Sequence, residues 1–238
     1  MAILTYHAVN PGWQSPLSVA PDRFERHCAW LSRRHRVVPV AEAAGRIVSS
    51  GKLPSRVVSI TFDDGYEDLF DHALPALARH DLGATVFLVS ATLTDNRSVD
   101  WVNSLPGEPL RTLRLEQILE MQEAGVSFGS HSRIHHDLTE LTDEECERDL
   151  RDSKEALEAL LGRQVSLLAY PRGLHDERVR AAAVRAGFSY AFGSSKPMGP
   201  VGRYSIPRVG VYGDDGLPWL ALKTLAVYPR LKRLLGRT

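Results

Sequence analysis

The sequence predicts an α/β fold in which parallel strands close into a barrel. The chain has 238 residues and a 43% hydrophobic composition, enough for one full core. Short β-branched apolar runs alternate with longer amphipathic runs, which is typical of parallel strands joined by helices. Seven such strand-like runs fit barrel closure. We expect a single domain over residues 1–238, with 213–238 as a basic amphipathic tail.

The elements follow from local signals along the chain. A helix should begin after Thr142, where Glu145 completes a capping box, and end near Gly162. Residues 91–110 should form a long loop, and such loops are often functional. The candidate strands are 3–7, 57–62, 84–89, 126–130, 166–170, 190–192 and 207–211, and the further helices are 21–34, 41–49, 66–80, 115–124 and 177–186.

Charge and cysteine content exclude several classes of protein. The 29 basic and 29 acidic side chains cancel, so no whole-surface field recruits nucleic acid. Cys28 and Cys146 lie far apart, which indicates neither a disulfide framework nor a cysteine zinc site.

We find no leader pattern and no long apolar span, so we expect a cytoplasmic chain. The basic tail could lie on a membrane surface, or it could form a terminal helix packed on the barrel.

Polar residues follow four of the predicted strands. His7 follows the first strand, Asp63 and Asp64 follow the strand 57–62, and His131 follows the strand 126–130. The turn Pro171-Arg172-Gly173 follows the strand 166–170. Because ligand sites in βα folds gather at the carboxyl ends of strands, we expect these groups to share one rim.

Two sequence patterns predict a metal site at this rim. The adjacent carboxylates of Asp63 and Asp64 repel each other, and a divalent cation would relieve the repulsion, although an N-cap is the alternative. His131 and His135 are four residues apart, close enough on one helical turn to bind one metal. Together these residues form a His-His-Asp set suited to Zn²⁺ or a similar ion, with His136 as an alternative to His135.

Three motifs resemble a known family. "TFDDG" at 61–65, "HSRIH" at 131–135 and "AYPRG" at 169–173, in this order, resemble the first three motifs of the polysaccharide deacetylases of carbohydrate esterase family 4. The resemblance covers roughly residues 2–212. It implies a distorted (β/α)₇ barrel, one Zn²⁺, Co²⁺ or Ni²⁺ ion per chain, and removal of an N-acetyl group from an amino sugar.

The resemblance also implies roles for individual residues. Asp63 would be the catalytic base, and Asp64, His131 and His135 would hold the metal. The backbone N–H of Arg172, after the motif-three proline, would stabilise the oxyanion. The substrate would be an N-acetylated amino sugar in a polymer, a lipid-linked glycan or a small glycoside.

The chain departs from the family pattern at two points. The motif-three arginine is replaced by Ala169, as in the poly-N-acetylglucosamine subgroup. We therefore expect Arg208 to pair with Asp63 in its place, and the alternative is that Arg208 is an ordinary surface arginine. No histidine follows His175, so the family's late histidine is absent. Because the departing amine needs an acid, we expect His7 to supply the proton, with His175 as the second candidate.

Three aromatic residues are candidates for stacking on a sugar ring. Tyr66, Trp101 and Tyr170 lie in or beside the motifs and the long loop, although Trp101 could equally be a buried structural residue. The sequence as a whole predicts a metal-dependent hydrolase that removes N-acetyl groups. The alternatives are another amide or formamide hydrolase on the same barrel, or a catalytically silent glycan-binding protein.

Overall fold

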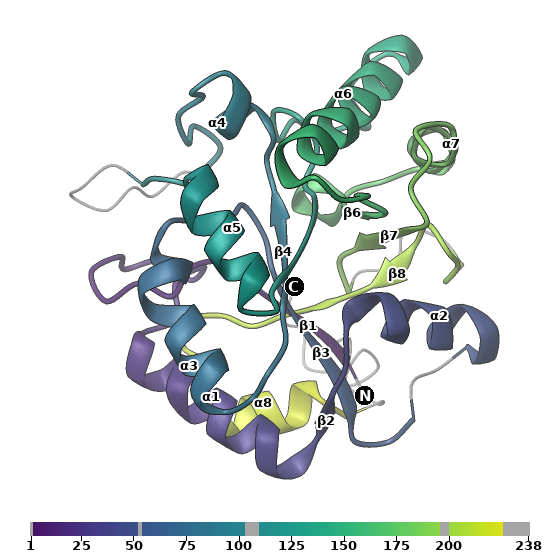
Figure 1. Cartoon of the computed structure of the whole chain (residues 1–238). Coiled ribbons are helices and arrows are strands. Elements are labelled where there is room, and N and C mark those ends of the chain that lie inside the picture. The colour runs from purple at the N-terminus through teal and green to yellow at the C-terminus, as the bar shows by residue number, and fades with distance from the viewer. Residues whose placement is uncertain (1, 52–53, 103–109, 196–199, 226–238) are drawn as a thin grey trace.

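In the computed structural model, a parallel sheet is curled into a nearly closed barrel and surrounded by helices (Figure 1). The structure describes residues 2–51, 54–102, 110–195 and 200–225. The sheet order is β8-β7-β6-β5-β4-β3-β1-β9, with β2 paired to β3, and every pair is parallel. The strands are β1 (Ala2–Tyr6), β2 (Arg36–Val37), β3 (Val57–Phe62), β4 (Thr85–Leu88), β5 (Ser127–Ser130), β6 (Leu167–Ala169), β7 (Tyr190–Gly193), β8 (Ile206–Pro207) and β9 (Val209–Gly210). The predicted α/β barrel is confirmed.

The barrel closes through the segment predicted as one strand over 207–211. In the structure this segment is two short strands, β8 on β7 and β9 on β1, and only Arg208 separates them. The Arg208 N–H donates to the Gly193 carbonyl at 3.2 Å, and the Val211 N–H donates to the Thr5 carbonyl at 2.8 Å. The segment therefore bridges the two ends of the sheet. The two-residue strand β2 was not predicted, because so short a run carries no periodic signal.

The helices agree closely with the sequence prediction. The α6 capping box is present, since the Glu145 N–H donates to Thr142 Oγ1 at 3.3 Å and the Thr142 N–H donates to Glu145 at 2.9 Å. The structure differs from the prediction at two places. The predicted helix 66–80 begins with a π-helical turn, and the predicted loop 91–110 contains the short helix α4. Residues 103–109 of that loop lie outside the described residues. The helices are α1 (Pro21–Arg34), α2 (Val40–Ser50), η1 (Leu69–Ala73), α3 (Leu74–Arg79), α4 (Ala91–Thr94), α5 (Leu115–Glu123), α6 (Asp143–Leu161), η2 (Pro171–Gly173), α7 (Glu177–Arg185) and α8 (Leu217–Lys223).

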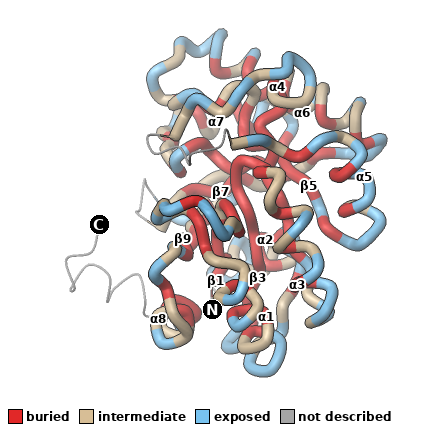
Figure 2. The backbone as a smooth tube through the Cα atoms, turned by 90° about the vertical axis from the view of Figure 1, so that its left-hand side faces the viewer, coloured by how far each residue is buried: buried red, intermediate tan, exposed pale blue. Residues whose placement is uncertain are grey.

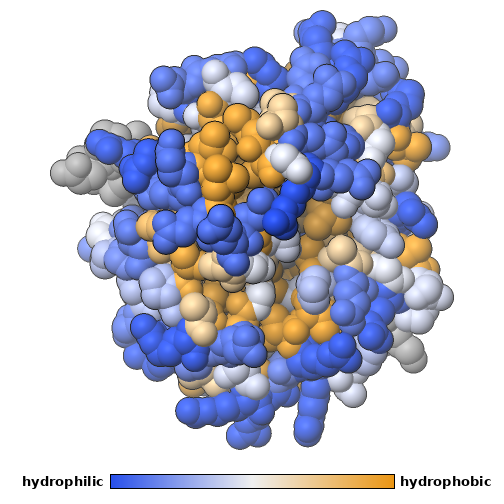
Figure 3. Space-filling view, in the orientation of Figure 1, coloured by the Kyte–Doolittle hydropathy of each residue, from blue (hydrophilic) through white to orange (hydrophobic). Residues whose placement is uncertain are grey.

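The strands are buried on both faces, as expected when helices cover a parallel sheet. Every position of β1 and β3 is buried, and exposed residues lie mainly on helices and loops (Figure 2). On the face of the molecule that Figure 3 shows, hydrophilic residues cover most of the surface, and apolar residues are visible between them. The hydroxyl oxygens of Thr5 and Thr61 lie 3.1 Å apart across β1 and β3. Because side chains two positions apart along a strand point to the same side, we expect His7 and Asp63 to extend on the same side of the sheet as these threonines.

The C-terminal segment packs on the barrel as far as it is described. Helix α8 contacts α1, and the buried Lys223 ammonium binds the Asp215 carboxylate and donates to the Gly210 carbonyl at 2.9 Å. The remaining tail residues, 226–238, lie outside the described residues, so a membrane contact there stays a prediction. Among the described helices, none combines the length and apolar character needed to cross a bilayer.

We expect Asp215→Ala to lower the free energy of unfolding by about 3–5 kcal/mol, because it leaves the Lys223 ammonium buried without its counter-charge. Chemical denaturation followed by circular dichroism measures this loss. The matched control is Asp22→Ala, since Asp22 pairs with Arg26 at 2.9 Å but its side chain is 69% exposed. The control should lose only about 0.3–0.5 kcal/mol, and an equally small loss in Asp215→Ala would contradict the expectation.

Candidate active site

Three predicted metal ligands meet at the carboxyl ends of β3 and β5. One ligand atom from each of Asp64, His131 and His135 lies within 4.8 Å of the others, and all three residues are buried. Asp64 Oδ1 is 3.6 Å from His131 Nε2 and 3.3 Å from His135 Nε2. His136 is exposed and does not belong to this cluster. The structure therefore brings together the residues that the sequence singled out.

The chemistry of this cluster fits a divalent transition metal. Asp64 Oδ1 is fully buried yet accepts no hydrogen bond from the described residues. His131 Nδ1 lies 2.8 Å from the Ala169 carbonyl, so a proton on Nδ1 leaves the Nε2 lone pair facing Asp64. Burial lowers the pKa of His131 to about 4, which keeps the imidazole neutral. Neutral imidazoles around an unpaired carboxylate oxygen are ligands that Zn²⁺ accepts.

Electrostatics favour the ionised form of Asp64. Burial alone would raise the pKa of this carboxyl, but the neighbouring His135, followed by His131, outweighs burial and lowers it well below its ordinary value. Asp64 is therefore a carboxylate at neutral pH, as a metal ligand must be.

The two histidines lie in a loop, and the expectation of a helical turn was wrong. The chain after β5 has left-handed backbone at Ser132 (φ 66°) and at His135 (φ 59°). Asp64 (φ 68°) and Arg172 (φ 56°), at two other strand ends, share this conformation. Left-handed backbone is unfavourable for residues other than glycine, and such strain tends to gather at functional sites.

The predicted pair of Asp63 and Arg208 is confirmed. Arg208 donates through both terminal nitrogens, at 2.7 Å to Asp63 Oδ1 and 2.8 Å to Oδ2. Each residue is only 4% exposed, so Arg208 is not a surface arginine. Burial would raise the pKa of Asp63, but Arg208 and then His131 outweigh it and hold this pKa below its ordinary value. Asp63 Oδ2 lies 4.0 Å from His131 Nε2, so the carboxylate sits beside the metal cluster.

His7 lies next to the two aspartates. Its neighbour Tyr6 is in register with Phe62, and the Asp63 N–H donates to the Tyr6 carbonyl at 3.0 Å. Positive charge on His7 contributes to lowering the pKa of both Asp63 and Asp64. Its Nδ1 is buried and has no hydrogen-bond partner among the described residues. His7 is therefore placed to exchange a proton at the site.

His175, the second candidate for the acid, lies in a different environment. Its Nδ1 is 3.2 Å from an Arg180 nitrogen, and its ring packs 4.8 Å from the ring of Tyr170. Burial lowers the pKa of His175 to about 4, and the charges that act on it are those of Arg180 and Asp176. None of these interactions involves Asp63 or Asp64, and the assignment of the acid to His7 stays a prediction.

The two tyrosines do not offer their rings to a ligand. Tyr66 and Tyr170 are both 0% exposed, so the expectation that they stack on a sugar was wrong. The Tyr170 hydroxyl donates to the Tyr204 carbonyl at 3.0 Å. Burial, followed by the charge of Asp64, raises the pKa of Tyr66, so its hydroxyl stays protonated beside the metal cluster.

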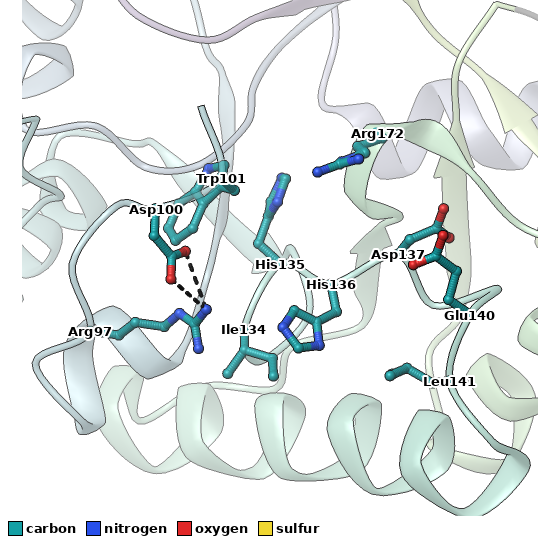
Figure 4. A pocket seen from close by; sticks show the side chains of 10 residues that line it. All are labelled: Arg97, Asp100, Trp101, Ile134, His135, His136, Asp137, Glu140, Leu141 and Arg172. Carbon is teal, nitrogen blue, oxygen red and sulfur yellow. Dashed lines mark hydrogen bonds and ion pairs between the residues drawn. The ribbon is translucent and has the colours of Figure 1, made fainter. Parts of the chain in front are cut away.

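A cavity of about 330 Å³ opens over His135. Trp101 lies in it and stacks on the His135 ring, with centroids 4.9 Å apart and planes 20° apart. The exposed side chain of Arg172 extends toward His135, and His136 lies at the other side of the cavity (Figure 4). Trp101 thus packs on one of the three clustered candidate ligands and lines the cavity.

The turn after β6 forms another part of the rim. Pro171 and Gly173 are buried, and Gly173 has φ 70°. A Cβ at Gly173 would come within 2.5 Å of the Ser194 nitrogen, so only glycine fits there. The role of the Arg172 N–H as an oxyanion donor stays a prediction.

The sequence analysis missed Asp149 of α6. Its buried carboxylate accepts the N–H of Arg133, between the two histidine ligands, at 2.8 Å. A signal was available, because Asp149 falls on the same helical face as Leu150 and Leu157, where an apolar residue is expected.

Comparison with known proteins identifies relatives that match most of the chain. The family model described as polysaccharide deacetylase matches residues 50–191. YxkH of Bacillus subtilis is 29% identical over 216 residues, covering 89% of this chain and 71% of YxkH. The poly-beta-1,6-N-acetyl-D-glucosamine N-deacetylase of Staphylococcus epidermidis is 27% identical over 209 residues, covering 83% of this chain and 69% of that protein.

Solved structures share the fold. The deacetylase PplD of Streptococcus pyogenes, in complex with acetate, superposes with a TM-score of 0.78 at 24% identity, covering 94% of this chain and 98% of PplD. IcaB from Ammonifex degensii has the same TM-score at 23% identity, covering 94% and 97% of the two chains. The family match spans more than half of the chain and includes Asp63, the three clustered metal ligands and the turn 171–173. The chain therefore belongs to the polysaccharide deacetylase family.

Proposed function

We propose that this protein is a metal-dependent hydrolase that removes N-acetyl groups from amino-sugar units of a glycan. The observation that carries the proposal is Asp63, which Arg208 holds as a buried carboxylate beside the cluster of Asp64, His131 and His135. A protein that only binds glycans needs no base beside a metal. The S. epidermidis relative is named for poly-beta-1,6-N-acetyl-D-glucosamine, which supports N-acetylglucosamine oligomers as the first substrates to test.

The chain's own residues divide the proton transfers between them. A metal ion held by Asp64, His131 and His135 would supply Lewis acidity at the acetyl carbonyl and toward the attacking water. Asp63 accepts the proton of that water, because Arg208 keeps the carboxylate ionised. The Arg172 N–H donates to the developing oxyanion. His7 donates a proton to the departing amine, which is a poor leaving group without it.

We expect Asp63→Asn to lower acetate release from N-acetylglucosamine oligomers by about 10²–10⁴-fold, because a general base contributes a factor of this size. Metal content should not change, since Asp63 binds Arg208 and is not one of the clustered ligands. Acetate and formate assays, run beside metal analysis, measure both quantities. Full activity in Asp63→Asn would contradict the assignment of the base. Formate release by the wild type from a matched N-formyl substrate, without acetate release from the N-acetyl one, would support the formamide hydrolase instead.

Replacement of His7 should identify the acid. We expect His7→Gln to lower acetate release by about 10²–10⁴-fold with metal retained, since the amine then leaves without a proton donor. The comparison variant is His175→Gln, because His175 contacts Arg180 and Tyr170. A large loss in His175→Gln together with wild-type turnover in His7→Gln would reverse the assignment.

Arg208→Lys should move the acid limb of the pH–rate profile to higher pH. Arg208 is the main charge that lowers the pKa of Asp63, and a single ammonium cannot reproduce the two parallel hydrogen bonds. Because the base works only when ionised, activity in the variant should already be lost at a pH where the wild type is active. The pH dependence of kcat/KM measures this shift, with surface Arg26→Lys as the control. An acid limb that stays in place would contradict the proposed role of Arg208.

A further inference from the structure

The loop that carries both histidine ligands is attached to β4 on one side. The His131 N–H donates to the Leu88 carbonyl at 2.8 Å, and the Arg133 carbonyl accepts the Ala91 N–H at 2.9 Å. Within the loop, Ser132 Oγ accepts the His135 N–H at 3.0 Å. These contacts leave the Arg133 N–H, between the two histidines, free to bind a group on α6.

Helix α6 meets those N–H groups with a carboxylate. Asp149 is 7% exposed, and its Oδ1 accepts the Arg133 N–H at 2.8 Å. Burial raises the pKa of Asp149 above its ordinary value, and the N–H groups of Arg133 and Ile134 oppose this shift by favouring the ionised carboxylate. Consecutive N–H groups that follow a left-handed residue form a concave anion site, and here Ser132 is that left-handed residue.

A second polar residue on the same face of α6 supports the start of the loop. Ser153, one turn after Asp149, is 0% exposed and shares a hydrogen bond of 2.7 Å with Ser130 Oγ. Ser130 Oγ also accepts the Ser132 N–H at 3.1 Å. The two polar residues of an otherwise apolar helix face therefore both contact the loop that presents the metal ligands.

We infer that Asp149 is a positioning residue for the metal site, because its carboxylate fixes the left-handed loop that places His135 opposite Asp64. The inference rests on the proposed function and deepens it, since Asp149 acts on the loop backbone and not on the metal or the substrate. Without Asp149, the part-buried Arg133 N–H loses its acceptor, and the loop can relax away from the geometry that the metal requires.

The test is the zinc affinity of variants, measured by competition with a chromophoric chelator. We expect Asp149→Ala to weaken zinc binding by about ten- to a hundred-fold, the usual effect of removing an outer partner of a metal site. Asp149→Asn keeps an oxygen acceptor for the Arg133 N–H and should recover part of this loss. The matched control is Asp152→Ala on the same helix, whose 41% exposed side chain should leave zinc affinity unchanged.

The visible absorption spectrum of the Co²⁺-loaded protein gives a readout that a purely structural role would not change. A changed spectrum in Asp149→Ala is expected, whereas wild-type affinity and spectrum, even with a lower melting temperature, would overturn the inference. If Asp149→Ala does not fold, the same criterion applies to Asp149→Asn, for which a smaller loss is expected. A wild-type protein that binds neither Zn²⁺ nor Co²⁺ would overturn the proposed metal site itself.

Discussion

The buried ion pair between Asp63 and Arg208 is the interaction on which the barrel and its site both depend. Arg208 is the single residue between β8 and β9, where the chain crosses from one end of the sheet to the other. Its guanidinium reaches across the barrel mouth to the end of β3 and lies 5.1 Å from the Phe87 ring. Because a buried charge is costly without its partner, the pair holds the closing segment in place and at the same time keeps the Asp63 carboxylate ionised.

Two adjacent carboxylates acquire different roles because the backbone turns between them. Asp63 directly follows β3, and its carboxylate binds Arg208. The backbone at Asp64 is left-handed, and the second carboxylate lies beside the imidazoles of His131 and His135. Both pKa values are lowered, and the leading partner is Arg208 for Asp63 and His135 for Asp64. Neighbouring acids in distinct environments are a common way to separate a base from a ligand.

The rim is supported from outside the barrel as well as from within it. The last residue of β6 fixes the proton on His131 through the Ala169 carbonyl, and α6 reaches the loop between the histidines through Asp149. Trp101 covers His135 from the long loop. The outer elements therefore do more than cover the sheet, since they hold backbone that would be unfavourable in isolation.

The sequence by itself determined the strands, most of the helices, the capping box of α6 and the residues of the Asp64, His131 and His135 cluster, because each depends on residue types at short spacing. Only the tertiary structure decided that the histidines lie in a loop and that Tyr66 is buried. It also confirmed the predicted pairing of Arg208 with Asp63 across 145 positions, and it showed that Asp149 faces the loop of the two histidines. Local propensity acts within a few residues, whereas these contacts depend on strand register and barrel closure, which involve the whole chain.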